Sequence, residues 1–355
     1  MKILVTGICG FVGSTLTRAL LEAGENLQIT GVDNFIRPGS ELNRRELAKL
    51  GVKIMHADVR SATDIETLPA ADFVIDAAAN TSVLAGVDGK TSSRQLLEHN
   101  LWGTVNILEY CKTHRAGLIL LSTSRVYSVP TLAALPMELH QKAFRPKRNE
   151  ILLEGISAAG VSEKFSTAPP ISLYGSSKLA SEAVALEYAE TFQFPVWVNR
   201  CGVLAGAGQF GKADQGIFSF WLNSHLRRRP LKYIGFDGGG HQVRDCLHPR
   251  DLVPVLLAQM KSDCKDKPRI ANLSGGAKNS MSLAQLHDWC DARFGKHAVA
   301  ADANPRPFDI PWMVLDSSLA EKTWSWSPKT LLPQVLDEIA AHAEQNPNWL
   351  EISNS

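Results

Sequence analysis

Length, composition and charge already exclude several classes of protein. The chain has 355 residues, 45% of them hydrophobic, so it can bury a sizeable core and is long for one domain but short for three. Its formal net charge is +1 and its charges are mixed along the chain, so no nucleic-acid partner is expected.

The cysteines and the hydropathy of the chain exclude further classes of protein. The six cysteines are dispersed without a Cys-x-x-Cys pair, and the histidines show no ligand spacing, so neither a disulfide framework nor a metal site is expected. The chain has no apolar run of about 18 residues and begins with a strand pattern rather than a signal peptide. We therefore expect a cytoplasmic protein with no membrane partner.

Apolar runs of strand length alternate with helical patterns through the first 200 residues. A helix is expected over residues 174–192, and the strands are expected near residues 2–6, 27–32, 52–57, 71–76, 117–121 and 195–200. This alternation predicts an α/β fold with a doubly wound parallel sheet of the Rossmann type.

The remaining chain is less regular. Residues 128–171 form a proline-containing insertion whose structure the pattern does not specify, and the glycines of 202–240 predict loops around one helix at 217–228. Such loops bind substrate in open α/β sheets. We expect a cofactor domain at 1–200 and, mainly at 201–345, a smaller C-terminal α/β substrate lobe with some segments returning to the first domain. The tryptophans expected in the core of this lobe are Trp312, Trp324 and Trp326.

The turn after the first strand is a candidate dinucleotide site. Glycines at a strand-to-helix turn let backbone N–H groups approach a pyrophosphate, and the positive end of the new helix dipole faces it. The spacing is Gly-x-x-Gly-x-x-Gly, which meets the general dinucleotide pattern loosely, and a glycine-rich turn without a ligand also fits. The residues expected here are Gly7, Cys9, Gly10, Phe11, Val12 and Gly13.

Further cofactor contacts are expected at the ends of the next strands. Asp33 lies where a carboxylate can accept hydrogen bonds from both adenosine ribose hydroxyls, which favours NAD, although Arg37 keeps NADP open. A solvated strand end would also explain Asp33. Asp58 and Val59 fit the adenine edge, and small residues after the fourth strand fit the pyrophosphate and nicotinamide ribose, although small residues also simply pack: Ala77, Ala78 and Ala79.

Candidate catalytic residues follow the fifth strand and open the helix before the sixth. Tyr174 and Lys178 are four residues apart, so they share a helix face and the ammonium can lower the phenol pKa from about 10. A drop of roughly three pH units requires about 4 kcal/mol from Lys178 and a cationic nicotinamide together. The Tyr-x-x-x-Lys pair alone is weak. Its position beside the hydroxyls of 122–124 places both at the nicotinamide end of the expected cofactor.

These residues resemble the extended short-chain dehydrogenases/reductases, in particular the NAD-dependent nucleotide-sugar epimerases and dehydratases. The resemblance covers residues 1–328 and rests on the motifs at Thr6–Ser14, Ser122–Tyr127, Leu173–Lys178, Gln242–Asp251, Asn272–Gly276 and Trp326–Pro328. It implies NAD as cofactor, a nucleotide-diphosphate sugar as substrate, a homodimer, and a catalytic triad of Thr123, Tyr174 and Lys178. It also adds Asn34 and Asn100 to the cofactor-binding set.

The resemblance extends to the substrate end. Segments 208–210, 214–216 and 242–245 are similar to those of members that epimerise C2 of a CDP-hexose. Arg244 suits bidentate recognition of a diphosphate, although Arg244 and Asp245 also fit a local ion pair, and His248 a helix start. Departures from the family pattern at Ser128, 201–205 and Pro311 bear on the substrate and not on the triad. The expected substrate-binding residues are Ser124, Gln209, Asp214, Gln215, Arg244 and Arg306.

The implied reaction is epimerisation through a transient keto sugar. Tyr174 takes the proton of a sugar hydroxyl, Thr123 hydrogen-bonds the reacting oxygen, and Lys178 lowers the tyrosine pKa and holds the nicotinamide ribose. Dehydratases of the family carry an acid and a base, usually Asp-Glu, where this chain has Ser124 and Arg125, so elimination is disfavoured. An NAD(P)-dependent reductase of a keto sugar or other carbonyl, and a non-catalytic NAD(P)-sensing regulator, are the alternatives.

Overall fold

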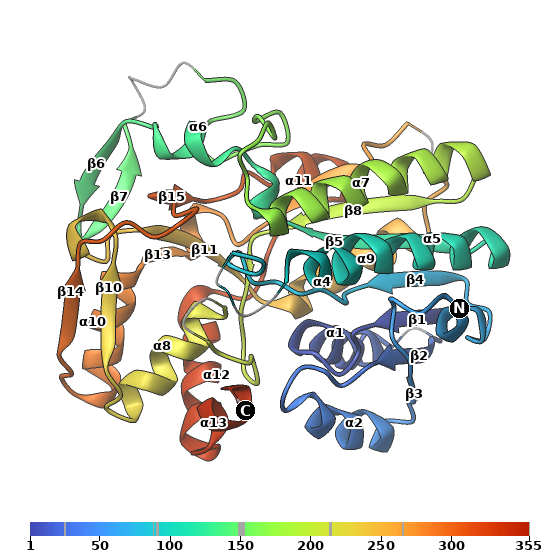
Figure 1. The fold of residues 1–355 in the computed structure, drawn as a ribbon, viewed down its shortest axis with the longest axis horizontal. Helices are drawn as coiled ribbons and strands as arrows, with labels where there is room; N and C mark the ends of the chain where they lie inside the picture. The colour runs from blue at the N-terminus through green and yellow to red at the C-terminus, as the bar shows by residue number, and fades with distance from the viewer. Residues whose placement is uncertain are drawn as a thin grey trace.

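A seven-stranded parallel sheet forms the centre of the larger domain (Figure 1). The computed structural model describes residues 1–24, 26–87, 89, 92–147, 153–212, 215–264 and 266–354. The strand order is β12-β8-β5-β4-β1-β2-β3, so the order reverses between β1 and β4, where open α/β sheets bind ligands. The strands are β1 (Lys2–Thr6), β2 (Gln28–Asp33), β3 (Lys53–His56), β4 (Phe73–Asp76), β5 (Gly117–Thr123), β8 (Val196–Cys201) and β12 (Ile270–Leu273).

Helices cover both faces of this sheet, because alternate strand residues point to opposite sides. Ile3 and Val5 pack in one core with Leu16 and Leu256, whereas Leu4 packs in the other with Ile107. The first core is covered by α1 (Phe11–Glu22), α2 (Ser40–Lys49), α9 (Val253–Met260) and α11 (Ser318–Trp324). The second is covered by α3 (Ala62–Glu66), α5 (Gly103–His114) and α7 (Leu173–Phe192); α4 (Ser93–Leu97) and a π-helical turn, Glu98–Trp102, precede α5.

The predicted doubly wound fold is confirmed, with two corrections. A seventh strand, β12, extends the sheet beside β8 although the sequence did not predict it, because it runs directly into Ser274-Gly275-Gly276, which has the pattern of a turn. Trp324 and Trp326 were expected in the smaller lobe but belong to the core of the large sheet, where Trp324 packs edge-on against Trp197 with 5.0 Å between ring centroids. The chain crosses back to the sheet before them. Trp312 does lie in the smaller lobe, where it packs with the insertion.

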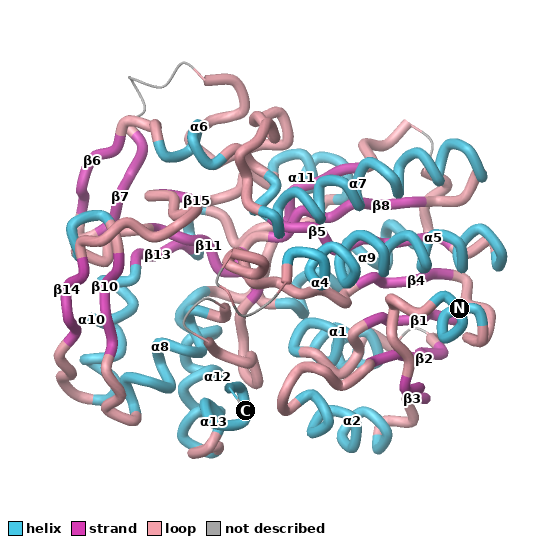
Figure 2. The backbone as a smooth tube through the Cα atoms, in the orientation of Figure 1, coloured by secondary structure: helices cyan, strands magenta, loops and turns pink. Residues whose placement is uncertain are grey.

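The second lobe lies beside the carboxyl ends of the large sheet (Figure 1). Long loops join its short strands (Figure 2). Its elements are β9 (Val203–Leu204), α8 (Ile217–Leu226), β10 (Leu231–Ile234), β11 (Val243–Leu247), β13 (Ser280–Ser282), α10 (Leu283–Phe294), β14 (Val299–Asp302), β15 (Trp312–Met313), α12 (Leu332–Gln345) and α13 (Trp349–Asn354), with 3-10 turns at Phe236–Gly238, Pro249–Leu252 and Ala277–Asn279. β11 is central, pairing with β9, β13 and β15.

The insertion at 128–171 contains α6 (Val129–Ala133) and an antiparallel hairpin, β6 (Met137–His140) and β7 (Ala143–Pro146). It packs on β11 and β15 through one apolar cluster that includes Leu132, Val243 and Leu315. The insertion is therefore part of the smaller lobe rather than an isolated loop.

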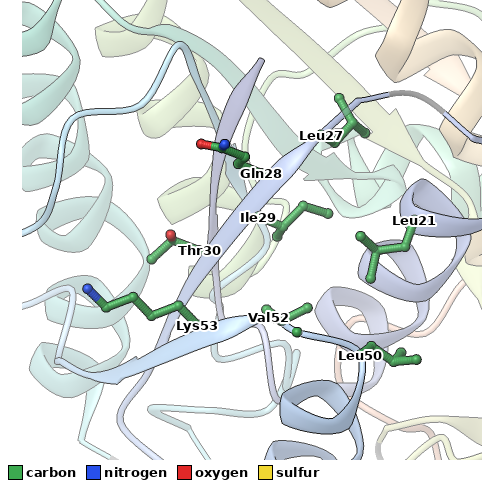
Figure 3. A pocket seen from close by; sticks show the side chains of 9 residues that line it. Leu21, Leu27, Gln28, Ile29, Thr30, Leu50, Val52 and Lys53 are labelled. Carbon is green, nitrogen blue, oxygen red and sulfur yellow. The ribbon is translucent and has the colours of Figure 1, made fainter.

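Figure 3 shows a hollow and the side chains that line it. It lies among α1, β2 and β3, and its lining residues are Leu21, Leu27, Gln28, Ile29, Thr30, Leu50, Gly51, Val52 and Lys53. Gln28 and Lys53 begin their strands, so the hollow is at the amino ends, away from the edge where parallel sheets bind ligands. Among the described residues, no helix is both long and apolar enough to cross a membrane.

Candidate active site

The glycine turn after β1 can pack tightly only because it lacks side chains. Gly7 has φ +61°, and a Cβ there would lie 2.9 Å from Cα of Ala78. A Cβ on Gly13 would lie 2.3 Å from the Gly7 carbonyl oxygen. The turn therefore packs directly against the chain after β4, and the first N–H groups of α1, at Phe11 and Val12, point out of the helix start, where a pyrophosphate can accept from them. These residues fit a dinucleotide.

Asp33 fixes the shape of this turn. Its carboxylate accepts hydrogen bonds from the backbone N–H of Cys9 at 2.9 Å and of Phe35 at 2.8 Å. Burial raises the pKa of Asp33, while these backbone bonds act in the opposite direction. The carboxylate thus lies beside the turn at the end of β2, at the place predicted for the ribose.

Arg37, the residue that kept NADP possible as the cofactor, lies against the second lobe. Its guanidinium donates to Gln215 Oε1 at 2.8 Å and to the carbonyl of Phe210 at 3.2 Å. Gln215 was expected to bind substrate, but the structure places it at this contact between the domains. Nearby, Asn34 donates to Asp58 at 3.0 Å, and Arg60 pairs with the same carboxylate and holds the pKa of Asp58 well below its usual range.

The chain after β4 is held by two polar side chains. Thr6 Oγ1 accepts the N–H groups of Ala77 and Ala78, each at 3.1 Å, and Ala79 is exposed. Asn100, predicted as a cofactor ligand, is buried, and its side-chain amide bonds to other residues of the protein. Its Oδ1 accepts from Asn80 N at 2.8 Å, and its Nδ2 donates to Asn80 O and Ser177 Oγ, both at 3.0 Å. Its side chain positions this segment against α7. Val59 is likewise buried and packs on α5 at Gly103.

Thr123 and the start of α7, which carries Tyr174 and Lys178, lie at the carboxyl edge of the sheet. Thr123 is the last residue of β5, and its side chain interacts with that of Tyr174, the second residue of α7. Ser172 caps this helix by accepting from Gly175 N at 3.1 Å. A Cβ on Gly175 would lie 2.2 Å from the carbonyl oxygen of Arg125, so α7 can approach the end of β5 only with glycine there.

Electrostatics at this edge differ from the expectation based on Tyr-x-x-x-Lys spacing. Burial raises the pKa of Tyr174, whereas the hydrogen bond from Thr123 and the charge of Arg125 oppose that change. Burial lowers the pKa of Lys178, and Asp76 and Glu182 oppose it. The cation that acts on the tyrosine here is therefore Arg125, which the sequence analysis did not count among the site residues.

A buried polar network supports the strand ends behind Lys178. Arg200 pairs with Glu182 at 2.7 Å, with side chains only 6% and 2% exposed, and Ser122 also donates to Glu182. Tyr127, against whose ring Arg200 lies, donates to Asn272 Oδ1 at 2.7 Å. These contacts join α7, β8 and β12, so the position of Lys178 depends on side chains far apart in sequence.

Three arginines gather at the substrate end. Electrostatic interactions connect Arg125 to Arg244, Arg306 and Asp309, and Arg125 Nη1 donates to the carbonyl of Phe308 at 3.3 Å. Arg244 pairs with Asp309 at 3.1 Å and donates to its neighbouring carbonyl, Val243 O, at 2.8 Å.

The other predicted substrate residues are less open to a ligand. The ion pair of Arg244 is with Asp309 and not with the adjacent Asp245. The Asp245 carboxylate instead accepts hydrogen bonds from Val203 N at 3.2 Å and Leu315 N at 3.0 Å. Gln209 is 8% exposed and donates to Leu204 O at 2.6 Å, and Ser124 is 6% exposed. Asp214 lies outside the described residues.

The fold and the site are those of an extended short-chain dehydrogenase/reductase, and comparison with known proteins gives the same class. The model of the NAD dependent epimerase/dehydratase family matches residues 3–274, and the chain belongs to this family. The predicted class of enzyme and NAD as its cofactor are thereby confirmed.

Relatives over nearly the whole chain include several sugar-nucleotide epimerases. CDP-paratose 2-epimerase of Salmonella typhi is 28% identical and covers 93% of this chain and 95% of its own. UDP-glucuronate 4-epimerase of Thermodesulfobacterium geofontis is 25% identical, covering 97% and 96%. The solved structure of UDP-glucuronic acid 4-epimerase from Bacillus cereus in complex with NAD is 25% identical, with a TM-score of 0.75 over 98% of this chain and 100% of that one.

Proposed function

We propose that the protein is an NAD-dependent epimerase that inverts C2 of a CDP-hexose through a transient keto sugar. The observation that carries the proposal is the placement of Thr123, at the end of β5, next to Tyr174, at the start of α7, on the carboxyl edge of the sheet that also carries the glycine turn. Similarity to CDP-paratose 2-epimerase over 93% of the chain supports CDP and C2, whereas other relatives act at C4 of UDP-sugars according to their names.

The residues of the site divide the chemistry among themselves. NAD, bound along the glycine turn, supplies a reversible hydride acceptor. Tyr174, as phenolate, takes the proton of the reacting hydroxyl, and Thr123 donates a hydrogen bond to the same oxygen. Lys178, beside Asp76 and Glu182, would hold the nicotinamide ribose, and the charge of Arg125 would support the phenolate. Once the sugar presents its other face, the hydride would return to the same carbon and Tyr174 would return the proton, so the reaction would have no net redox change.

The charge of the substrate end fits a diphosphate with a neutral sugar. Arg125, Arg244 and Arg306 with Asp309 leave a net excess of two positive charges. A diphosphate diester carries one negative charge on each phosphate, so it balances this excess, and guanidinium groups bind phosphate in bidentate fashion. A uronic acid would add a carboxylate that this cluster does not balance.

The test follows the hydrogen on the reacting carbon. CDP-hexose deuterated at C2 is incubated with the enzyme, beside CDP-, UDP-, GDP- and dTDP-hexoses labelled at C2 or C4. The C2 epimer of the CDP-sugar should form with deuterium retained, because the hydride leaves and returns at one carbon. Inversion only at C4, or only of a UDP-sugar, would contradict the C2 assignment, and loss of deuterium to water would contradict the keto-sugar route.

Tyrosine variants test the proposed base. Tyr174→Phe should lower kcat about a hundredfold or more while retaining NAD, because the ring keeps its apolar contacts with Ala85 and Leu96. Tyr188→Phe is the matched control on the same helix, since its hydroxyl bonds only to Glu109 in the described structure, at 2.7 Å. Full activity of Tyr174→Phe would refute the mechanism.

We also propose that the enzyme is a homodimer. Leu97 and Trp102, in neighbouring turns before α5, are 40% and 56% exposed, an apolar pair suited to a partner surface. Light scattering should give twice the chain mass, and Trp102→Glu should give a monomer. A monomeric wild-type protein would contradict the proposal.

A further inference from the structure

A cluster of histidine and aspartate side chains lies in the smaller lobe, apart from the proposed active site. His225 is near the end of α8, and His287 and Asp291 are one turn apart on α10. One ligand atom from each lies within 4.8 Å of the others. Nε2 of His225 and Nε2 of His287 are each 3.5 Å from Asp291 Oδ1. The sequence analysis expected no metal site, because these residues come from two helices about 60 positions apart and show no ligand spacing.

These separations match the coordination sphere of a small transition-metal ion. Zinc binds imidazole nitrogen and carboxylate oxygen at about 2.0–2.1 Å, so two ligands on a tetrahedral ion lie about 3.3–3.4 Å apart. The two 3.5 Å separations to Asp291 are close to this value before any adjustment. We propose that His225, His287 and Asp291 bind one Zn²⁺ ion, with water in the fourth position.

Nε2 of both rings faces Asp291, and Nε2 of His225 also lies 3.0 Å from the carbonyl oxygen of Gly295. An ion at the cluster would replace that last contact, because a ligating nitrogen carries no proton to donate to a carbonyl.

The surroundings allow an ion to enter and be retained. The His225 side chain is fully buried, whereas those of His287 and Asp291 are 13% and 28% exposed, so the cluster opens to solvent on one side. Aromatic rings of Trp221 and Phe294 lie around the imidazoles. An ion here would join α8 to α10 across the core of the lobe, so its expected role is structural, independent of the proposed epimerase activity.

Metal binding is tested on the full-length protein after treatment with EDTA. Titration with Zn²⁺ alone should show one ion per chain and a higher melting temperature. Binding should weaken by at least about 100-fold in His287→Ala and in the nearly isosteric Asp291→Asn, since even losses around a metal site cost about 10- to 100-fold. His140→Ala, an exposed histidine on β6, is the control and should bind as wild type does.

Co²⁺ provides the second measurement, because it gives intense visible absorption only in a tetrahedral site. Wild-type protein should show this absorption, and Asp291→Asn should lose it while circular dichroism and NAD content remain normal. The proposal is overturned if wild-type protein gives no saturable binding, if the two ligand variants bind as tightly as wild type, or if His140→Ala removes the binding. Failure of these tests leaves the NAD site and the epimerase proposal untouched.

Discussion

Replacing Arg125 with methionine should move the pH dependence of catalysis. Burial and the neighbouring Arg244 and Arg306 lower the pKa of Arg125 to about 10, so the guanidinium is still charged near pH 7. Its charge lowers the pKa of Tyr174. An opposite charge close to an ionisable group shifts its pKa by about 1 to 3 pH units, and Asp309 offsets part of that here, so we expect the lower end.

The sign follows from the role of Tyr174 as a base. Activity rises with pH as the phenolate forms, so a raised tyrosine pKa moves the acidic limb of kcat to higher pH by about one unit. Below that limb the rate should fall about tenfold, and alkaline pH should restore it. Arg125→Lys should retain most of the effect, and Arg145→Met on the exposed hairpin is the control. An unchanged limb with a higher KM would show that Arg125 binds substrate and does not act on Tyr174.

Three further predictions concern the cofactor, the diphosphate and acid stability. Calorimetry should show tighter binding of NAD than of NADP because of Asp33, and equal or tighter NADP binding would contradict this role. Arg244→Ala should raise KM strongly, with a loss of about 2 to 4 kcal/mol in kcat/KM and unchanged NAD affinity; a lower melting temperature with normal KM would indicate a structural role through Asp309 instead. Burial lowers the pKa of His248 to about 3, below its unfolded value of about 6.5, so stability should fall as pH drops from about 6.5 toward 3, by up to about 4 kcal/mol. Urea unfolding of His248→Gln should lack most of this slope, and an equal slope in both proteins would refute the assignment.

The parts of the fold that sequence predicts are those with a strong local signal. The strand at Lys2–Thr6 and the glycine turn after it lie next to one another in sequence, and the helix Leu173–Phe192 differs by one residue from its predicted start. β12 was missed because its last two residues belong to the Asn272–Gly276 motif, whose glycines indicate a turn rather than a strand. Trp326 was misplaced because composition does not show when the chain returns to an earlier sheet.

The candidate site divides in the same way. Thr123, Tyr174 and Lys178 occur in short motifs at the end of a predicted strand and the start of a predicted helix, so the sequence alone could propose them as one site. The partner of Arg244 could not be predicted, because Asp309 is 65 residues away and the carboxylate of the adjacent Asp245 accepts from the backbone N–H groups of Val203 and Leu315. Long-range ion pairs depend on loop paths, which leave no periodic trace in the sequence.

Arg125 also bears on which reaction this site can perform. The resemblance implies that dehydratases place an acid and a base at the two positions after the threonine, where this chain has Ser124 and Arg125. The carbonyl of Arg125 packs against Gly175, so the backbone fixes this position next to Tyr174 whatever side chain it carries. A carboxylate there would oppose formation of the tyrosine phenolate, whereas a guanidinium favours it. The arginine thus supplies no base for elimination and strengthens the base that a reversible oxidation needs, which is the combination an epimerase requires.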